Sequence, residues 1–165
     1  MTLYLMDTNA FNNICDAEDV DVATIARQAQ GRVYVTHIQQ DEVNNTRDVA
    51  RRDVLRGCLQ TINAEPWPTE TFMIGKSRLG MARLSDGRRY HAILDELNNR
   101  KKKRSNEADA LIGETAEARE CVLVSDDQDL SEVMREVGVQ VIGWRQFVKE
   151  LSDPSPATSA GLVGP

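Results

Sequence analysis

The sequence predicts an α/β sandwich, in which helices cover both faces of a central, mainly parallel β-sheet. Short runs of aliphatic and β-branched residues alternate along the chain with stretches whose apolar residues recur at helical spacing. The chain has 165 residues, which suits one domain with a sizeable core. No unbroken apolar stretch exceeds four residues, so a membrane-spanning helix is excluded.

The first half of the chain contains two predicted strands, and each leads into a helix. The first strand is short and ends at Asp7, whereas the second reads RVYVT and is rich in β-branched and aromatic residues. The predicted elements are a strand at 3–6, a helix beginning over 8–15, a helix at 20–30 ended by Gly31, a strand at 32–36 and one long helix or two at 38–62. The apolar residues predicted to face inward in the last of these are Val43, Val49, Val54, Leu55 and Leu59.

The second half is less regular where it begins. Pro66 and Pro68 flank Trp67 and break the pattern, so residues 69–74 are predicted as strand or loop and 75–80 stay unassigned. The elements predicted beyond are helices at 90–98, 106–119, 130–136 and 145–151 and strands at 122–125 and 139–143. Pro, Ser, Gly and Ala dominate from Pro154 onward. A flexible tail at 153–165 is therefore expected after a single domain at 1–152.

Charge is distributed unevenly along the chain. The net charge of −6 argues against a general polyanion-binding protein. Residues 47–104 nevertheless hold 14 Lys and Arg against 7 Asp and Glu, whereas the rest of the chain holds 6 against 19. The densest basic run, at 100–104, is either a solvated loop or helix end, or a patch that contacts phosphates.

Cysteine and histidine are scarce. The three cysteines are widely spaced and form no CxxC pair, so neither a disulfide framework nor a zinc knuckle is expected. The two histidines are too few for chemistry based on several histidine ligands. The first residues include no basic leader, which argues against a signal peptide. These features fit a cytoplasmic protein that has no membrane partner.

Carboxylates occupy the places where an α/β sheet forms its sites, at the carboxyl ends of the strands. Asp7 follows the first strand, and an acidic group made up of Asp126, Asp127 and Asp129 follows the strand at 122–125. Asp109 lies at the start of the helix at 106–119, and Glu42 lies in the helix after the second strand. Each of these acids also has a simple local explanation. In this interpretation, each Asp that follows a strand serves to cap the next helix or to form a turn. Asn106 and Asp109 would then form a capping pair, and Glu42 would simply be an exposed helical residue.

Hydrolysis of a phosphodiester requires a nucleophilic water and stabilisation of negative charge. Carboxylates that hold one or two Mg²⁺ or Mn²⁺ ions supply both, because hard cations prefer oxygen ligands. Such a site needs several acids and no histidine. Basic residues must surround it to attract the substrate, which fits the basic middle and acidic ends of this chain.

Four segments resemble motifs of the PIN-domain nucleases, particularly the VapC-like ribonuclease toxins of bacteria. They read LMDTNAF at 5–11, VTHIQQDEV at 35–43, NEADALIGETA at 106–116 and VLVSDDQDL at 122–130. They occur in the order of the family, and the resemblance spans residues 3–143. It implies a PIN-like three-layer α/β/α sandwich with a central, mainly parallel sheet.

The resemblance also implies which residues form the site. Its catalytic carboxylates, which hold Mg²⁺ or Mn²⁺, are expected to be Asp7, Glu42, Asp109 and Asp127. Asp129 is expected as an auxiliary metal ligand, and Thr8, Asn9 and Ser125 as supporting residues. Asp126 falls at a variable position and is not assigned, and a register error of one residue would exchange Asp41 and Glu42.

Two features depart from the family pattern. His37, Gln39 and Gln40 occupy positions where the family frequently has hydrophobic residues or proline. Residues 57–105 match no motif and hold most of the basic excess, so they are interpreted as a basic, helical insertion region within the domain.

The expected activity is metal-dependent endoribonuclease activity on RNA. Candidate RNA contacts are Arg47, Arg51, Arg52, Arg100, Lys101, Lys102, Lys103 and Arg104. If the chain is a toxin, a cognate antitoxin protein is the expected partner, and a homodimer is the expected assembly.

Three alternatives stay open at this point. The chain is also compatible with a PIN nuclease for RNA processing or structured DNA that has no toxin role. A second alternative is a catalytically silent PIN-like binding module. The third, a phosphoacceptor receiver domain, fits less well, because Asp7 has no acidic neighbour and Lys149 lies in the last predicted helix.

Overall fold

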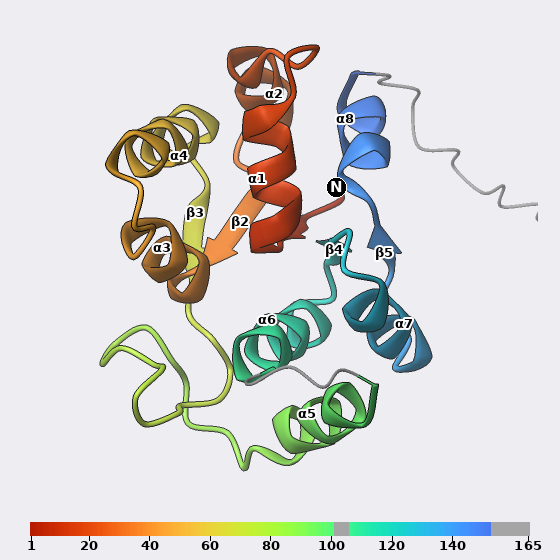
Figure 1. The fold of residues 1–165 in the computed structure, drawn as a ribbon. Helices are drawn as coiled ribbons and strands as arrows, with labels where there is room; N and C mark the ends of the chain where they lie inside the picture. Colours follow the sequence, from red (N-terminus) through yellow and green to blue (C-terminus); the bar gives the residue numbers. More distant parts are fainter. Residues whose placement is uncertain (101–105, 153–165) are drawn as a thin grey trace, which may run out of the picture.

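The computed structural model describes residues 1–100 and 106–152 (Figure 1). The cations predicted at 101–104 and the tail predicted at 153–165 lie outside these residues. Its elements are β1 (Tyr4–Met6), α1 (Thr8–Asp16), α2 (Val22–Ala29), β2 (Val33–Thr36), α3 (His37–Asn44), α4 (Val49–Ile62), β3 (Glu65–Trp67), α5 (Arg88–Arg100), α6 (Glu107–Ala118), β4 (Val122–Val124), α7 (Gln128–Glu136), β5 (Val141–Ile142) and α8 (Trp144–Ser152). No helix in this described part is long and apolar enough to cross a membrane.

The five strands form one sheet in the order β3-β2-β1-β4-β5, and every neighbouring pair is parallel. Tyr4 of β1 is in register with Val33 of β2 on one side and with Val122 of β4 on the other. Since all strands run in the same direction, their carboxyl ends meet at one edge of the sheet. The residue that follows the central strand β1 therefore lies in the middle of that edge.

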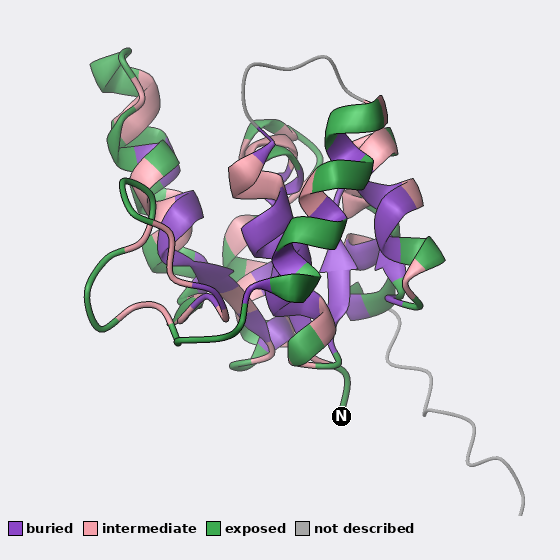
Figure 2. Ribbon diagram, turned by 90° about the horizontal axis from the view of Figure 1, so that it is seen from below, coloured by how far each residue is buried: buried purple, intermediate pink, exposed green. Residues whose placement is uncertain are grey.

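Helices cover both faces of the sheet, which confirms the predicted sandwich. Tyr4 and Met6 of β1 pack into one core cluster with residues of α1, α2, α4 and α8. Leu5, between them, packs into the opposite cluster with α3, α5, α6 and α7. The alternation is the two-residue period of a strand that is buried on both sides. Figure 2 shows buried residues gathered in the interior, on the sides of the helices that face the sheet, and exposed residues on the outer sides of the helices.

Two elements differ from the sequence-based expectation. Glu65–Trp67 forms the edge strand β3 despite Pro66, because a proline at a sheet edge need not donate a ladder hydrogen bond. The stretch 38–62 forms two helices, which is one of the two possibilities that the sequence left open. Val49 and Val54 of α4 were expected to face inward, but they are 58% and 51% exposed, so that expectation is wrong.

Residues 68–87, here called the connecting segment, link β3 to α5 without a helix or strand of their own. Thr69 is fully buried, and its backbone bonds to Met81 and Arg83 close the segment into a loop. Within the described part of the region 57–105, helix is confined to the end of α4 and to α5, and β3 belongs to the sheet.

Candidate active site

Asp7 lies directly after β1, at the middle of the carboxyl edge of the sheet. Its side chain is almost completely buried, with the residue only 3% exposed. One carboxylate oxygen accepts a hydrogen bond from the backbone N–H of Thr8 at 2.7 Å, and the other accepts one from the hydroxyl of Ser125 at 2.9 Å. Because Ser125 follows β4, the carboxylate is held between two neighbouring strands.

The pKa of Asp7 is raised to about 7. Burial is the main cause, and the negative charge of Asp109 is the next; Glu42 adds a smaller effect in the same direction. The hydrogen bonds from Ser125 and Thr8 act in the opposite direction, because they favour the charged carboxylate. The fold therefore brings three of the predicted acids near one another, although one follows β1 and the others lie in α3 and α6.

Glu42 lies on the exposed side of α3 and accepts a hydrogen bond from the hydroxyl of Thr8. The start of α3 is fixed by a capping box between Thr36 and Gln39. Gln39 also donates a hydrogen bond to the carbonyl oxygen of Met6 at 2.5 Å. This bond ties α3 to the end of β1, so that Glu42 is positioned relative to Asp7.

Asp109 lies in the first turn of α6 and is partly buried. A carboxylate is favoured there because the amino end of a helix carries a partial positive charge. The Asn106 side chain makes no capping hydrogen bond to the helix, in contrast to its role in the capping pair that the sequence suggested. Its amide instead donates to Asn98 of α5 at 2.9 Å.

Asp127 is the N-cap of α7, where its side chain accepts a hydrogen bond from the backbone N–H of Leu130 at 2.9 Å. Its own backbone N–H donates to the Ser125 hydroxyl, which in turn binds Asp7. Asp129 lies in the first turn of the same helix and is partly buried. Asp126 is exposed and accepts a hydrogen bond from Asn13 of α1.

Thr8 and Ser125 contact the acids directly, as described above. Asn9, in the first turn of α1, is exposed to solvent. Among the described residues, no group of three or more His, Cys, Asp or Glu side chains is close enough to hold a metal ion. The chemistry of the donor set nevertheless fits a hard divalent cation, because the donors are carboxylate oxygens and two of them act electrostatically on the buried carboxylate of Asp7.

Several of the predicted RNA contacts have other partners in the structure. Arg51 forms an ion pair with Asp16 of α1, and Arg52 donates to a backbone carbonyl at 3.4 Å. Arg100 binds Glu132 and Glu136 of α7 at 3.0 and 2.7 Å. Arg47 is exposed in the loop before α4.

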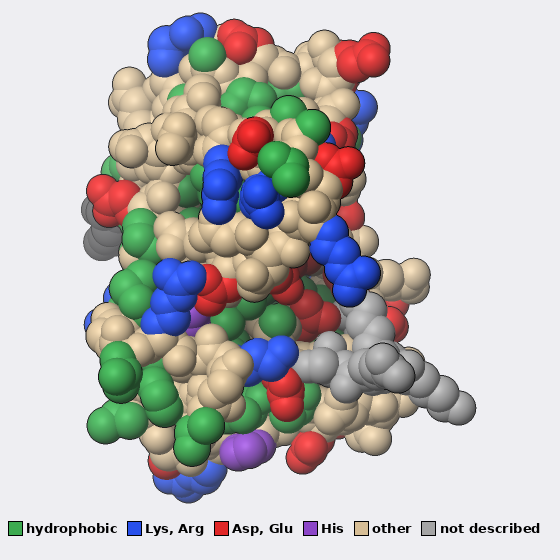
Figure 3. Space-filling model, turned by 60° about the vertical axis from the view of Figure 1, so that its left-hand side comes forward, with side chains coloured by type: hydrophobic (Ala, Val, Ile, Leu, Met, Phe, Trp, Pro, Cys, Tyr) green, Lys and Arg blue, Asp and Glu red, His purple; other side chains and the backbone are tan. Residues whose placement is uncertain are grey.

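Sequence reasoning missed two cations of the connecting segment that lie beside the acids. The Lys76 ammonium is 3.6 Å from a carboxylate oxygen of Glu107, in the first turn of α6. Arg78 forms an ion pair with Asp41, the residue before Glu42. Nothing in the sequence indicated this, because the segment has no periodicity. Figure 3 shows acidic side chains in a hollow of this face, with Lys and Arg side chains around it.

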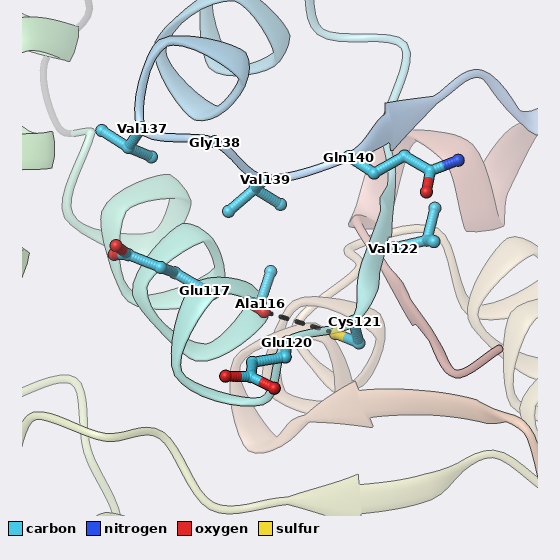
Figure 4. A pocket seen from close by; sticks show the side chains of 9 residues that line it. All are labelled: Ala116, Glu117, Glu120, Cys121, Val122, Val137, Gly138, Val139 and Gln140. Atoms are coloured by element: carbon cyan, nitrogen blue, oxygen red, sulfur yellow. Dashed lines mark hydrogen bonds between the residues drawn. The ribbon is translucent and has the colours of Figure 1, made fainter. Parts of the chain in front are cut away.

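A different pocket, of about 270 Å³, opens at the opposite edge of the sheet (Figure 4). It is lined by residues around the starts of β4 and β5, including Cys121, Val122, Val139 and Gln140. The thiol of Cys121 donates to the carbonyl oxygen of Ala116, and burial raises its pKa to about 11. Such a thiol is not a nucleophile at neutral pH, so this pocket offers less chemistry than the acidic edge.

No family model and no curated protein sequence matches the chain. Solved structures do match. PAE2754 from Pyrobaculum aerophilum is 15% identical, with a TM-score of 0.53 over 92% of this chain and 97% of that one. FitAcB from Neisseria gonorrhoeae is 18% identical, with a TM-score of 0.46 over 87% and 99%. VapBC-5 from Mycobacterium tuberculosis, a member of the VapBC family of toxin-antitoxin systems, is 17% identical, with a TM-score of 0.49 over 87% and 98%.

The match to PAE2754 includes nearly the whole of both chains, and the sheet and its two helical layers are as the sequence predicts. The chain therefore has a PIN-like α/β fold.

Proposed function

We propose that the chain is a divalent-metal-dependent endoribonuclease that hydrolyses phosphodiester bonds in RNA. The observation that supports this most is the environment of Asp7. A carboxylate is buried at the middle of the carboxyl edge of the sheet, and its pKa is raised first by this burial and then by the charges of two further carboxylates. Burial of a repelled charge costs stability, so such an arrangement is expected where a cation compensates it.

Asp7, Glu42, Asp109 and Asp127 are the proposed ligands of Mg²⁺ or Mn²⁺, with Asp129 as an auxiliary ligand. When bound, the cation lowers the pKa of a water molecule and offsets charge on the phosphate oxygens. Ser125 and Thr8 orient the carboxylates of Asp7 and Glu42 through their hydroxyl groups. Water is the proposed nucleophile, so no Ser or Cys nucleophile is needed.

As a finer proposal, the nuclease is the toxin of a toxin-antitoxin pair, with a cognate antitoxin protein as its partner. The resemblance of four sequence segments to motifs of VapC-like toxins supports this role. The proposed assembly is a homodimer, which light scattering tests directly. A mass of twice 18.5 kDa is expected, and a monomer mass would overturn the assembly without affecting the chemistry.

One observation favours a second candidate, a catalytically silent binding module. The Asp127 carboxylate caps α7, which is a sufficient structural reason for an Asp at this position. In this alternative the fold is retained and no metal-dependent cleavage occurs. The experiment that follows separates the two candidates.

Purified protein should cleave mixed cellular RNA when Mg²⁺ or Mn²⁺ is present, and EDTA should stop the cleavage. Asp7→Asn should reduce cleavage to background while the protein stays folded by circular dichroism. Asp95→Asn, which removes an exposed acid of α5, is the matched control and should cleave like the wild type. Equal cleavage by wild type and Asp7→Asn would contradict the proposed site, and no cleavage by the wild type would favour the binding module.

A further inference from the structure

We propose that a hollow beside Glu42 binds the ribose-phosphate unit next to the scissile bond of single-stranded RNA, and that Lys76 supplies its phosphate contact. That this unit lies next to a cleaved bond rests on the proposed nuclease function. The binding of single-stranded RNA at this hollow does not depend on cleavage, so the two proposals can fail separately.

The hollow has a volume of about 240 Å³ and lies between α3, the connecting segment and α6. It is lined by Ile38, Asp41, Glu42, Asn45, Gly75, Lys76 and Ala108. Glu42 belongs to the acidic edge, and Ala108 precedes Asp109 in the chain. A phosphodiester that lies across the acids therefore has its neighbouring unit at this hollow. The volume is below the usual range for drug-sized ligands and suits one such unit.

Lys76 is the cation on the wall of this hollow. Its ammonium lies 3.6 Å from Glu107, and both side chains are about 40% exposed. An ion pair this exposed and this long contributes little stability, so the ammonium can move to a phosphate at low cost. Arg51 and Arg100 differ, because each makes more than one short hydrogen bond to carboxylates outside the site.

The backbone of Lys76 is fixed against the helix that carries Glu42. His37, the first residue of α3, is fully buried, and its Nε2 lies 3.3 Å from the carbonyl oxygen of Lys76. The backbone N–H of Ser77 donates to the Met73 carbonyl at 2.8 Å, which closes a tight turn around Lys76. The ammonium is therefore carried on a fixed turn, and only its side chain must move to reach a ligand.

Charge neutralisation and exposed apolar side chains near this hollow together favour RNA in single-stranded form. Arg78 neutralises Asp41 beside Glu42, which reduces repulsion of a phosphate at this rim. Ile74 and Leu79, two and three residues from Lys76, are 93% and 91% exposed. These aliphatic side chains cannot stack as aromatic rings do, but unpaired bases can bury apolar surface against them, whereas a duplex keeps its bases stacked inside. The exposed Asn45 side chain offers a hydrogen-bonding partner for a ribose 2′-hydroxyl.

The test measures binding by the full-length Asp7→Asn protein, with its fold checked, so that cleavage does not interfere. The probe is a short fluorescein-labelled single-stranded RNA of mixed sequence, followed by fluorescence anisotropy over a range of salt concentrations. Adding Lys76→Gln should weaken binding by about tenfold and lower the slope of log affinity against log salt by about 0.7. Lys76→Arg should restore most of the affinity, and Lys149→Gln on α8 is the matched control that should change neither quantity.

The results separate this inference from the proposed function. If RNA binding depends on Lys76 but the wild-type protein does not cleave RNA, the RNA-binding hollow is supported and the nuclease function is overturned. Cleavage by the wild type, with affinity and salt slope indifferent to Lys76, would support the nuclease and overturn the hollow. Equal or tighter binding of the matching duplex, or no RNA binding at all, would also overturn this inference.

Discussion

Gln39 connects the helix that carries Glu42 to the end of the strand that precedes Asp7. Its side-chain oxygen accepts hydrogen bonds from the backbone N–H and the hydroxyl of Thr36, and its amide donates to the carbonyl oxygen of Met6. The side chain is 1% exposed, so each of these groups would lack a water partner if the amide were absent. A glutamine at this position therefore serves both the capping of α3 and the placement of Glu42.

Gln39→Ala should lower the free energy of unfolding by about 1–3 kcal/mol, the usual cost of leaving buried polar groups unsatisfied. Urea denaturation of the metal-free protein measures this change. Gln60→Ala on the exposed side of α4 is the control and should change stability by less than about 0.5 kcal/mol. A similarly small effect at Gln39 would show that water replaces the amide, which would contradict its role in tying α3 to β1.

The positions of the acids were predictable from the sequence, whereas the partners of the cations were not. Asp7 follows a recognisable strand, and the topology of a parallel sheet places such residues at one edge. Arg51 and Arg100 bind acids 35 and 36 residues away, and no local pattern encodes these contacts. Lys76 was not predicted either, because its position depends on a contact with His37, which lies far away in the sequence.

At the scale of elements, the connecting segment is the part of the chain that sequence patterns described least. It has no periodicity, and its position depends on a few buried polar contacts instead. The Thr71 hydroxyl donates to Glu114 in the middle of α6 at 2.7 Å and lies 2.6 Å from the Ser85 hydroxyl. Burial raises the pKa of Glu114, which the hydrogen bond from Thr71 partly offsets. This contact anchors the segment that carries Lys76 to the helix that carries Asp109.

Thr71→Val should loosen the connecting segment without unfolding the domain. Valine has a similar shape but cannot donate to Glu114, so the segment should open more readily. Amide hydrogen exchange followed by mass spectrometry should become about tenfold faster in peptides within 69–87, with the strands unchanged. Thr61→Val, which removes a hydroxyl bonded within α4, is the control. Unchanged exchange in 69–87 would show that other contacts hold the segment.

Two predictions about the elements were wrong because the tertiary structure, and not the local sequence pattern, determined the outcome. Pro66 argued against a strand, yet β3 is an edge strand that pairs only with β2, where a missing N–H has little cost. Val49 and Val54 suggested an inward face for α4, but its core contacts come from Leu55 and Ile62. A sequence pattern identifies apolar residues; the tertiary fold decides which of them the core has room for.

At the scale of the whole molecule, the candidate site lies at the centre of the structure that stabilises it. Asp7 follows the central strand and is buried between β1 and β4, so its ionisation affects the unfolding of the entire domain. Its folded pKa, about 7, is above the ordinary value of 3.8. The folded state therefore holds this proton more tightly than the unfolded state. The tighter binding of this proton contributes to the free energy of unfolding. The contribution is fully present below about pH 4 and is lost as the pH rises to about 7.

The metal-free wild type should consequently lose stability relative to Asp7→Asn between about pH 4 and about pH 7, by up to roughly 4 kcal/mol. The amide has the same shape without the charge, and comparing the two proteins cancels the titration of the groups that do not interact with Asp7. Melting temperatures in EDTA at about pH 4 and about pH 8 measure the difference. Mg²⁺ or Mn²⁺ at the higher pH should then stabilise the wild type and leave Asp7→Asn unchanged, because the cation binds the folded state through this carboxylate. If stability depends on pH in the same way in both proteins, the pKa of Asp7 is not raised in the folded state. If the cation stabilises both proteins equally, the metal binds elsewhere on the molecule.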